Sequence, residues 1–153
     1  MSDARRVEPM TQLRGVLHVP GDKSGSHRAL MLSALAAGES SIHGLSGGLD
    51  VTSTSRIVCQ LGAQRHDDAN VVHIEGPGDG LRASTHPLDC GNSGTTMRLI
   101  AGIISGVEGE HALIGDESLS RRPMDRVAEP LNRMGARVHG SGPREHAPLY
   151  VSG

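Results

Sequence analysis

A loop of glycine, serine and basic residues that leads into an apolar segment occurs twice in this chain of 153 residues, about seventy positions apart. The first loop spans residues 20–28 and the second spans residues 91–98. The apolar segments that follow them are residues 29–37 and 99–104. Because self-similarity on this scale is typical of stacked supersecondary units, we expect the chain to fold as two copies of one unit.

Both copies are predicted to contain the same elements in the order strand–helix–strand–helix–strand–strand. In the first copy we expect strands at 13–19, 41–45, 63–65 and 71–75, a polar turn at 66–70, and helices at 29–37 and 51–61, the second capped by Asp50. In the second copy we expect strands at 111–114, 137–139 and 149–152, and helices at 99–104 and from Pro123 to Met134. The predicted fold class is therefore α/β (α+β), built from repeated βαβαββ units whose apolar helices run parallel and buried.

The first loop has the composition of an anion site. Gly21 and Gly25 let the backbone approach a ligand closely, and the N–H groups of a helix's first turn favour negative charge. The loop adds two cations and two hydroxyls, namely Lys23, Arg28, Ser24 and Ser26. We expect phosphate or carboxylate here, although the loop is not a Walker loop because Lys23 precedes the second glycine. The alternative is an ordinary helix start with Ser26 as N-cap and both cations in solvent.

The second loop and the stretch after it offer further candidates. Gly94 also permits close backbone approach, with Thr95 or Thr96 as a plain N-cap in the alternative interpretation. Arg122, the second of two arginines before Pro123, can bind a carboxylate or phosphate bidentately. The alternative for this arginine pair is an exposed basic turn. If the two units stack in parallel, both loops point into one opening.

Composition excludes several classes of function. The net charge is −2 and the chain has no Phe or Trp, so it lacks both the basic field and the stacking rings of a nucleic-acid-binding protein. No apolar run reaches membrane-spanning length. Cys59 and Cys90 offer no disulfide framework, which fits a reduced, cytoplasmic setting. Cys90 is expected to be a small buried residue rather than a nucleophile. The nine histidines form no ligand motif and are expected to be scattered over the surface, with no metal site.

Three blocks of this sequence, taken together, resemble the signatures of one family. They are Gly-Asp-Lys-Ser-x-Ser-His-Arg-Ala at residues 21–29, Leu-Asp-Cys-Gly-Asn-Ser-Gly-Thr-Thr-Met-Arg-Leu at residues 88–99, and Gly-Asp-Glu-Ser-Leu at residues 115–119 followed by Arg-Pro-Met at 122–124. In this order and spacing they resemble EPSP synthase (3-phosphoshikimate 1-carboxyvinyltransferase) over essentially the whole chain. The resemblance implies transfer of the enolpyruvyl group of phosphoenolpyruvate to the 5-hydroxyl of shikimate 3-phosphate, in the shikimate pathway of aromatic amino-acid biosynthesis. It implies no metal or organic cofactor.

The resemblance also implies roles for individual residues. Shikimate 3-phosphate would be held by Lys23, Ser24 and Arg28. Phosphoenolpyruvate would be held by Lys23, Gly94 and Arg122, with Lys23 also acting in proton transfer. Asn92 and Thr95 are further candidates for a supporting role. Two polyanionic substrates need two convergent anion sites, and the repeat supplies two.

The family fold implied by the resemblance has two globular domains, each of three such units. Residues 1–20 would be a lead-in and a strand of the opposite domain. Residues 21–153 would be part of the substrate-binding domain, with unit one at about 21–85 and unit two at about 86–153. We therefore expect a fragment or a truncated relative, which binds phosphorylated ligands weakly, is inactive alone, and needs the missing C-terminal part or associates with itself. Gly25 departs from the aliphatic residue usual in the family and loosens the first helical turn by about 0.5–1 kcal/mol relative to alanine.

Two other functions stay open at this stage. The related UDP-N-acetylglucosamine enolpyruvyl transferase shares the fold and the chemistry, but it is expected to have Lys-Asn in place of Lys23-Ser24 and a reactive cysteine loop, which residues 115–123 lack. The chain could also be a non-catalytic module that binds anions or assembles with itself.

Overall fold

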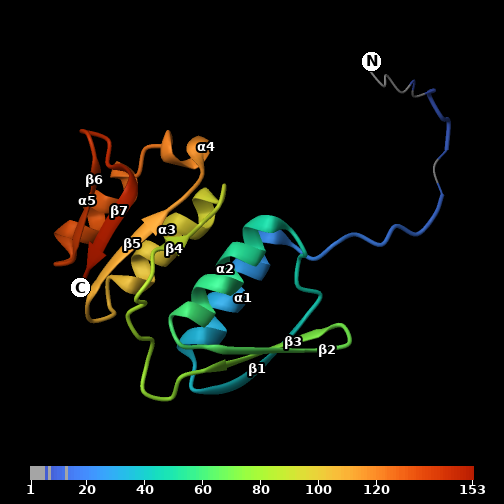
Figure 1. Cartoon of the computed structure of the whole chain (residues 1–153). Coiled ribbons are helices and arrows are strands. Elements are labelled where there is room, and N and C mark those ends of the chain that lie inside the picture. The colour runs from blue at the N-terminus through green and yellow to red at the C-terminus, as the bar shows by residue number, and fades with distance from the viewer. Residues whose placement is uncertain (1–5, 7, 13) are drawn as a thin grey trace.

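The computed structural model describes residues 6, 8–12 and 14–153, whose strands form two separate sheets (Figure 1). The first sheet has the strand order β1-β3-β2, with bounds Gly38–His43, Val71–Gly76 and Gln64–Asp68. The second has the order β4-β5-β7-β6, with bounds Leu88–Asp89, Glu110–Ile114, His146–Ser152 and Arg137–Ser141. The helices are α1 (Lys23–Leu35), α2 (Leu49–Gln60), α3 (Gly94–Ile104), α4 (Glu117–Ser120) and α5 (Asp125–Arg133). The expected mixture of helices and strands is confirmed.

Strand pairing follows the predicted repeat residue by residue. In the first sheet β3 pairs antiparallel with both neighbours, so that Glu75 lies opposite Glu39 of β1 and Gln64 of β2. In the second sheet Ser152 of β7 lies opposite Glu110 of β5 and Arg137 of β6 in the same way. The two units therefore share topology and register. One element differs, because β4 runs parallel to β5 and no strand takes the equivalent place beside β1 in the part of the chain that the structure describes.

The prediction of a strand at 13–19 is wrong for residues 14–19, which have no regular structure. Leu13 lies outside the described residues. Val16 and Leu17 are 86% and 84% exposed. Figure 1 shows this part of the chain leading away from the sheets, where it pairs with none of the strands described. An extended segment without a neighbouring strand leaves its backbone N–H and C=O groups to water, so the apolar pattern alone does not make a strand.

Both helices of the repeat begin earlier than expected, inside the loops themselves. Helix α1 starts at Lys23, and the Asp22 carboxylate, not Ser26, caps it by accepting a hydrogen bond from the Gly25 N–H. Helix α3 starts at Gly94, and Ser93 Oγ caps it by accepting from the Thr96 N–H at 3.1 Å, so neither Thr95 nor Thr96 is the N-cap. Short polar side chains bind the free N–H groups of the first turn, and this fixes where each helix starts.

Three further boundaries differ from the prediction. Gly48 rather than Asp50 occupies the N-cap of α2, which places Asp50 in its first turn. Pro123 does not open α5, which begins at Asp125 after an unpredicted short helix, α4. The polar turn of the first unit is confined to residues 69–70, so β2 continues to Asp68.

One aliphatic core joins the two units. Its members come from helices and strands of both, and the largest of them are completely buried, among them Leu30, Ile57, Ile74, Met97, Ile100, Leu113 and Leu149. Helix α1 is less buried than its apolar sequence predicts, since Leu32 and Leu35 are 65% and 55% exposed. One face of α1 is therefore left uncovered. None of the helices in the described residues has the length and hydropathy needed to cross a bilayer.

Candidate functional site

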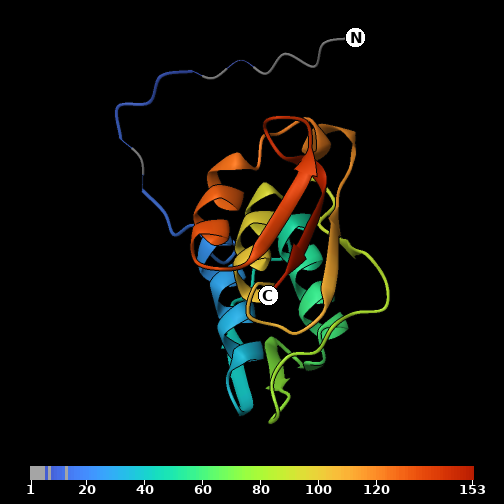
Figure 2. The same ribbon diagram turned by 90° about the vertical axis from the view of Figure 1, so that its left-hand side faces the viewer.

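A chain of buried hydrogen bonds joins the beginnings of α1, α2 and α3. His27 Nδ1 of α1 lies 2.7 Å from Thr54 Oγ1 of α2, and Thr54 Oγ1 lies 2.8 Å from Thr96 Oγ1 of α3. The Thr96 hydroxyl also donates to Ser93 Oγ, the N-cap of α3, at 2.7 Å. The three helices therefore lie side by side and start on the same side of the molecule, as Figures 1 and 2 show. This is the arrangement that the repeat predicted for two convergent loops.

The protonation of His27 follows from this network. Burial lowers the pKa of His27, nearby Lys23 lowers it further, and Asp50 opposes both, so the imidazole is neutral at neutral pH. We assign its proton to Nδ1, because every hydroxyl can then donate onward toward Ser93. Nε2 is buried and has no hydrogen-bond partner among the described residues. An unprotonated ring nitrogen is less costly to leave unpaired there than an N–H group.

Lys23 lies at the first position of α1 and pairs with the carboxylate of Asp50, in the first turn of α2. Asp50 lies next to the second unit as well, because its backbone oxygen is 3.3 Å from Thr96 Oγ1. The Lys23 side chain is 55% exposed. Its ammonium group can therefore exchange the carboxylate for an incoming anion without unfolding the helix start.

The guanidinium groups of Arg98 and Arg122 lie against the backbone of Gly94, the first residue of α3. A Cβ atom at this position would be 2.6 Å from Arg98 Nη1 and 3.3 Å from Arg122 Nη1. Arg98 is fixed in place because its Nη1 donates to the Gly94 oxygen at 3.3 Å and its Nη2 to the Pro123 oxygen at 3.2 Å. The absence of a side chain at residue 94 thus allows two cations to approach a helix N-terminus, which is where an anion binds most favourably.

Asn92 orients Arg122. Its Oδ1 accepts from Arg122 Nη2 at 2.6 Å, and its Nδ2 donates to Asp116 Oδ2 at 2.7 Å. The hydrogen bond from Asn92 and those from the Leu119 and Ser118 N–H groups hold the pKa of Asp116 below its usual value. The carboxylate is therefore ionised, and it fixes the Asn92 amide so that its oxygen faces the guanidinium group. The sequence offered Asn92 only as a supporting candidate, and the structure gives it this contact.

The remaining predicted residues lie at the same helix starts. Ser24 and Arg28 are exposed on α1, and Thr95 is half-buried on α3. The first intrahelical bond of α1 is donated by the Ser26 N–H to the Asp22 oxygen at 3.0 Å, so the N–H groups of Lys23 and Ser24 precede it. These two N–H groups and the side chains of Lys23, Ser24 and Arg28 make up the part of the site that the first loop supplies.

Ser26 has a structural role rather than the ligand-binding one expected from its place in the loop. Its hydroxyl donates to the Asp22 oxygen at 2.7 Å and accepts from the Ser46 N–H at 2.9 Å. These bonds hold the segment after β1 against the first loop. Gly21 lies so close to this segment that a Cβ atom would be 1.7 Å from the Gly44 oxygen.

Reasoning from the sequence missed the hydrogen-bonded chain and the role of Arg98. The sequence did contain one signal for these residues. The repeat aligns Thr96 with Ser26 and Arg98 with Arg28, so the same residue types recur at the same two positions of both loops. Thr54 gave a weaker signal, as one of three consecutive buried polar residues in α2. The prediction for Cys90 is confirmed: it is fully buried, and burial, together with Asp89, raises its thiol pKa to about 12, which makes it a poor nucleophile.

The expectation of scattered surface histidines holds for most of them but is wrong for two buried ones and for a stacked pair. His27 and His111 are buried, and His66 and His73 stack against each other on the first sheet. The stacking follows from the short turn at 69–70. Because the turn takes up only these two residues, β2 extends to Asp68 and residue 66 lies opposite residue 73.

Comparison with known proteins gives a consistent result. The profile of the family described as EPSP synthase (3-phosphoshikimate 1-carboxyvinyltransferase) matches residues 7–153. A 3-phosphoshikimate 1-carboxyvinyltransferase of Streptococcus gordonii is 47% identical over 142 residues, which are 92% of this chain and 33% of that protein. The protein of the same description from Streptococcus equi subsp. equi is 50% identical over the same shares.

The structural comparison agrees. The solved structure of EPSP synthase from Acinetobacter baumannii superimposes with a TM-score of 0.85 at 39% sequence identity, covering 91% of this chain and 32% of that chain. The chain thus spans about a third of the length of the curated relatives it matches.

Proposed function

Because the chain belongs to the EPSP synthase family, we propose that it supplies the part of a 3-phosphoshikimate 1-carboxyvinyltransferase that binds shikimate 3-phosphate and phosphoenolpyruvate. The observation that carries the proposal is the convergence of the two loops through the His27–Thr54–Thr96 chain. This chain brings two helix N-termini to one side of the molecule. Two polyanionic ligands that must react with each other need such a pair of adjacent anion sites.

In this proposal the first loop binds shikimate 3-phosphate. Arg28 and Ser24 are exposed beside the N–H groups that precede the first helical bond of α1, so they can reach a phosphate placed there. Lys23, in the first loop, pairs with Asp50, whose backbone oxygen lies next to Thr96 of the second loop, and in this proposal its ammonium group contacts both ligands. Once its ammonium group leaves Asp50 for substrate phosphate, it can also transfer a proton at the reacting atoms.

The second loop binds phosphoenolpyruvate. Gly94 lets the guanidinium groups of Arg98 and Arg122 lie close to the α3 start, where they attract the ligand's anionic groups, and Arg122, oriented by Asn92, forms a bidentate contact with a carboxylate or phosphate. The 5-hydroxyl oxygen of shikimate 3-phosphate then bonds to C2 of phosphoenolpyruvate and gives up its proton, while C3 takes up a proton. Phosphate departs from the resulting ketal by C–O cleavage as C3 loses a proton. The fixed cations stabilise the charge of the departing phosphate.

The protein also needs a partner in this proposal. Leu32 and Leu35 on α1 form an uncovered apolar face, as do Val16 and Leu17 in the segment before it. Apolar surface of this kind is normally covered. In this proposal a further segment of the enzyme covers this face of α1. The two free cysteines fit a cytoplasmic setting for such an enzyme.

Calorimetric titration of the chain with each substrate tests the proposal. We expect weak, saturable binding of shikimate 3-phosphate that is lost in R28A, and of phosphoenolpyruvate that is lost in R122A. The matched control is R126A, which removes an exposed arginine from α5. Equal affinities in R28A and R126A, or no binding to the native chain, would contradict the assignment of the site. Phosphate release at an ordinary enzyme rate by the chain alone would contradict its need for a further segment.

The exposed leucines of α1 favour a second function, that of a self-assembling module. Light scattering with and without shikimate 3-phosphate separates the two. A module that only assembles forms oligomers and shows no saturable response to the ligand.

A further inference from the structure

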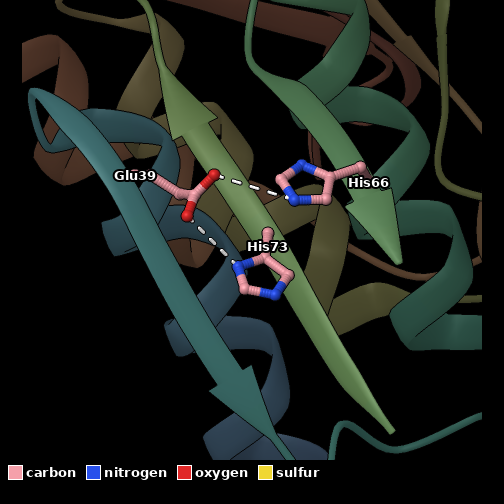
Figure 3. Close-up of side chains that lie close together, drawn as sticks. All are labelled: Glu39, His66 and His73. Carbon is pink, nitrogen blue, oxygen red and sulfur yellow. Dashed lines mark ion pairs between the residues drawn. The ribbon is translucent and has the colours of Figure 1, made fainter. Parts of the chain in front are cut away.

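Three side chains able to bind a metal ion lie together on the outer face of the first sheet (Figure 3). Glu39 Oε1 is 3.3 Å from His73 Nδ1, and Glu39 Oε2 is 3.7 Å from His66 Nε2. One ligand atom from each residue lies within 4.8 Å of the other two. From this cluster we propose that the chain binds one zinc ion through Glu39, His66 and His73, and the inference does not depend on the proposed function.

Strand register fixes the positions of the three residues. His66 of β2 and His73 of β3 are directly opposite each other, and their rings stack with centroids 4.5 Å apart and planes 1° from parallel. Glu39 of β1 is opposite Glu75, two residues along β3 from His73, and so lies on the same face. Because Ile74, the residue between them, is buried on the helix side, this face points away from α1 and α2.

The donor set suits zinc. Imidazole nitrogen and carboxylate oxygen are common zinc ligands at about 2.0–2.2 Å, which places neighbouring ligand atoms about 3.3 Å apart around a tetrahedral ion. The separation of Glu39 Oε1 and His73 Nδ1 already has this value. The other carboxylate oxygen, Oε2, is 3.7 Å from His66 Nε2, and one ligand atom of each residue lies within 4.8 Å of the other two. Rotation of the two imidazoles out of their parallel stack is needed for both lone pairs to face the ion. His73 must also exchange its contact with Ser41 Oγ, at 3.2 Å, for the metal. Water can occupy the fourth position, as the site is open to solvent.

The second unit provides an internal comparison. His139 of β6 is opposite Tyr150 of β7, and their rings stack with centroids 5.3 Å apart. Glu110 occupies the register position of Glu39. Both units thus have two stacked rings on neighbouring strands beside a glutamate. In the first unit both rings are imidazoles, whereas in the second unit one of them is the tyrosine ring. The second unit has the same framework with one zinc ligand fewer.

Zinc bound in this way would join all three strands of the first sheet. An ion that binds the folded chain in preference to the unfolded one stabilises the fold. The site faces away from α1, the helix that carries Lys23, so its role is structural rather than catalytic.

Calorimetric titration of chelator-treated chain with zinc chloride, at about pH 7.5 where ordinary histidines are neutral, tests the proposal. We expect one zinc ion per chain and a higher unfolding temperature with zinc. H66A and H73A should each weaken binding by about tenfold or more, and each should abolish the rise in unfolding temperature. H139A, the matched substitution in the second unit, should bind zinc as the native chain does. Unfolding temperatures measured with chelator confirm that the variants fold, which the exposure of residue 66 favours.

Three outcomes would overturn the proposal: no saturable zinc binding, native affinity in H66A and H73A, or an equal loss in H139A. The substitution Y150H tests the register argument by gain of a site. It places a second imidazole opposite His139, beside Glu110, and should raise the stoichiometry from one zinc ion to two. Unchanged stoichiometry in a folded Y150H chain would contradict the view that register alone assembles the site.

Discussion

Replacing Thr54 by valine should destabilise the fold through the loss of one hydroxyl. Thr54 is completely buried, and valine has nearly its shape, so the substitution changes hydrogen bonding with little change in packing. It leaves His27 Nδ1 without the partner that lies 2.7 Å away and removes the 2.8 Å contact to Thr96 Oγ1. A buried donor without an acceptor costs about 1–3 kcal/mol. We expect T54V to lower the free energy of unfolding by that amount.

Urea denaturation followed by circular dichroism measures the change, and the midpoint should fall without a change in slope. T52V is the matched control, because Thr52 lies on the same helix and its hydroxyl also donates a hydrogen bond, to the Gly48 oxygen at 3.2 Å. Thr52 is exposed, so water can replace that bond, and substitutions at exposed positions change stability by about 0.5 kcal/mol or less. The double variant T54V/T96V should be less destabilised than the sum of the single variants, by about 0.5–3 kcal/mol. A T54V chain as stable as T52V, or strictly additive effects, would refute the view that the hydroxyl chain ties the helices together.

Three further predictions concern the glycines, the buried histidine and the Asn92 contact. G21A should destabilise the fold by about 1–3 kcal/mol or more, because its Cβ would lie 1.7 Å from a backbone oxygen. G102A, with open space in the last turn of α3, should instead stabilise the fold by up to about 0.5–1 kcal/mol; denaturant midpoints of the two variants compare them directly. His27 has a lowered pKa in the folded chain, so the unfolded chain binds more protons below its ordinary pKa of 6.5, and stability should fall as the pH decreases through that value. H27N keeps a hydrogen-bonding group near the Nδ1 position without the titration, and an unchanged pH dependence of unfolding in H27N would exclude His27 as its source. N92A removes the acceptor that orients Arg122 and should weaken phosphoenolpyruvate binding about fivefold in a calorimetric titration, with shikimate 3-phosphate binding unchanged; equal effects on both ligands would point to a general loss of structure.

The sequence predicted the architecture well because its signals are local. The glycine after a helix, the apolar runs and the composition of each loop depend on residues near each other in the chain, and the second copy of the unit repeats each signal. The helix starts were placed several residues too late, since Asp22 and Ser93 cap from positions that the apolar pattern does not include. The strand expected at 13–19 fails over its described residues for the opposite reason. Its pattern is correct, but a strand forms only with a neighbour.

What the sequence alone determined is the repeated unit, the two glycine loops that head apolar helices, and membership of a family through three specific blocks. What only the tertiary structure decided is which side chains from distant segments meet. The His27–Thr54–Thr96 chain, the Lys23–Asp50 pair and the stacked His66 and His73 each depend on helix packing or strand register. A one-residue change of register moves a side chain to the other face of its sheet. No periodicity in the sequence fixes such contacts, because they depend on how whole elements pack.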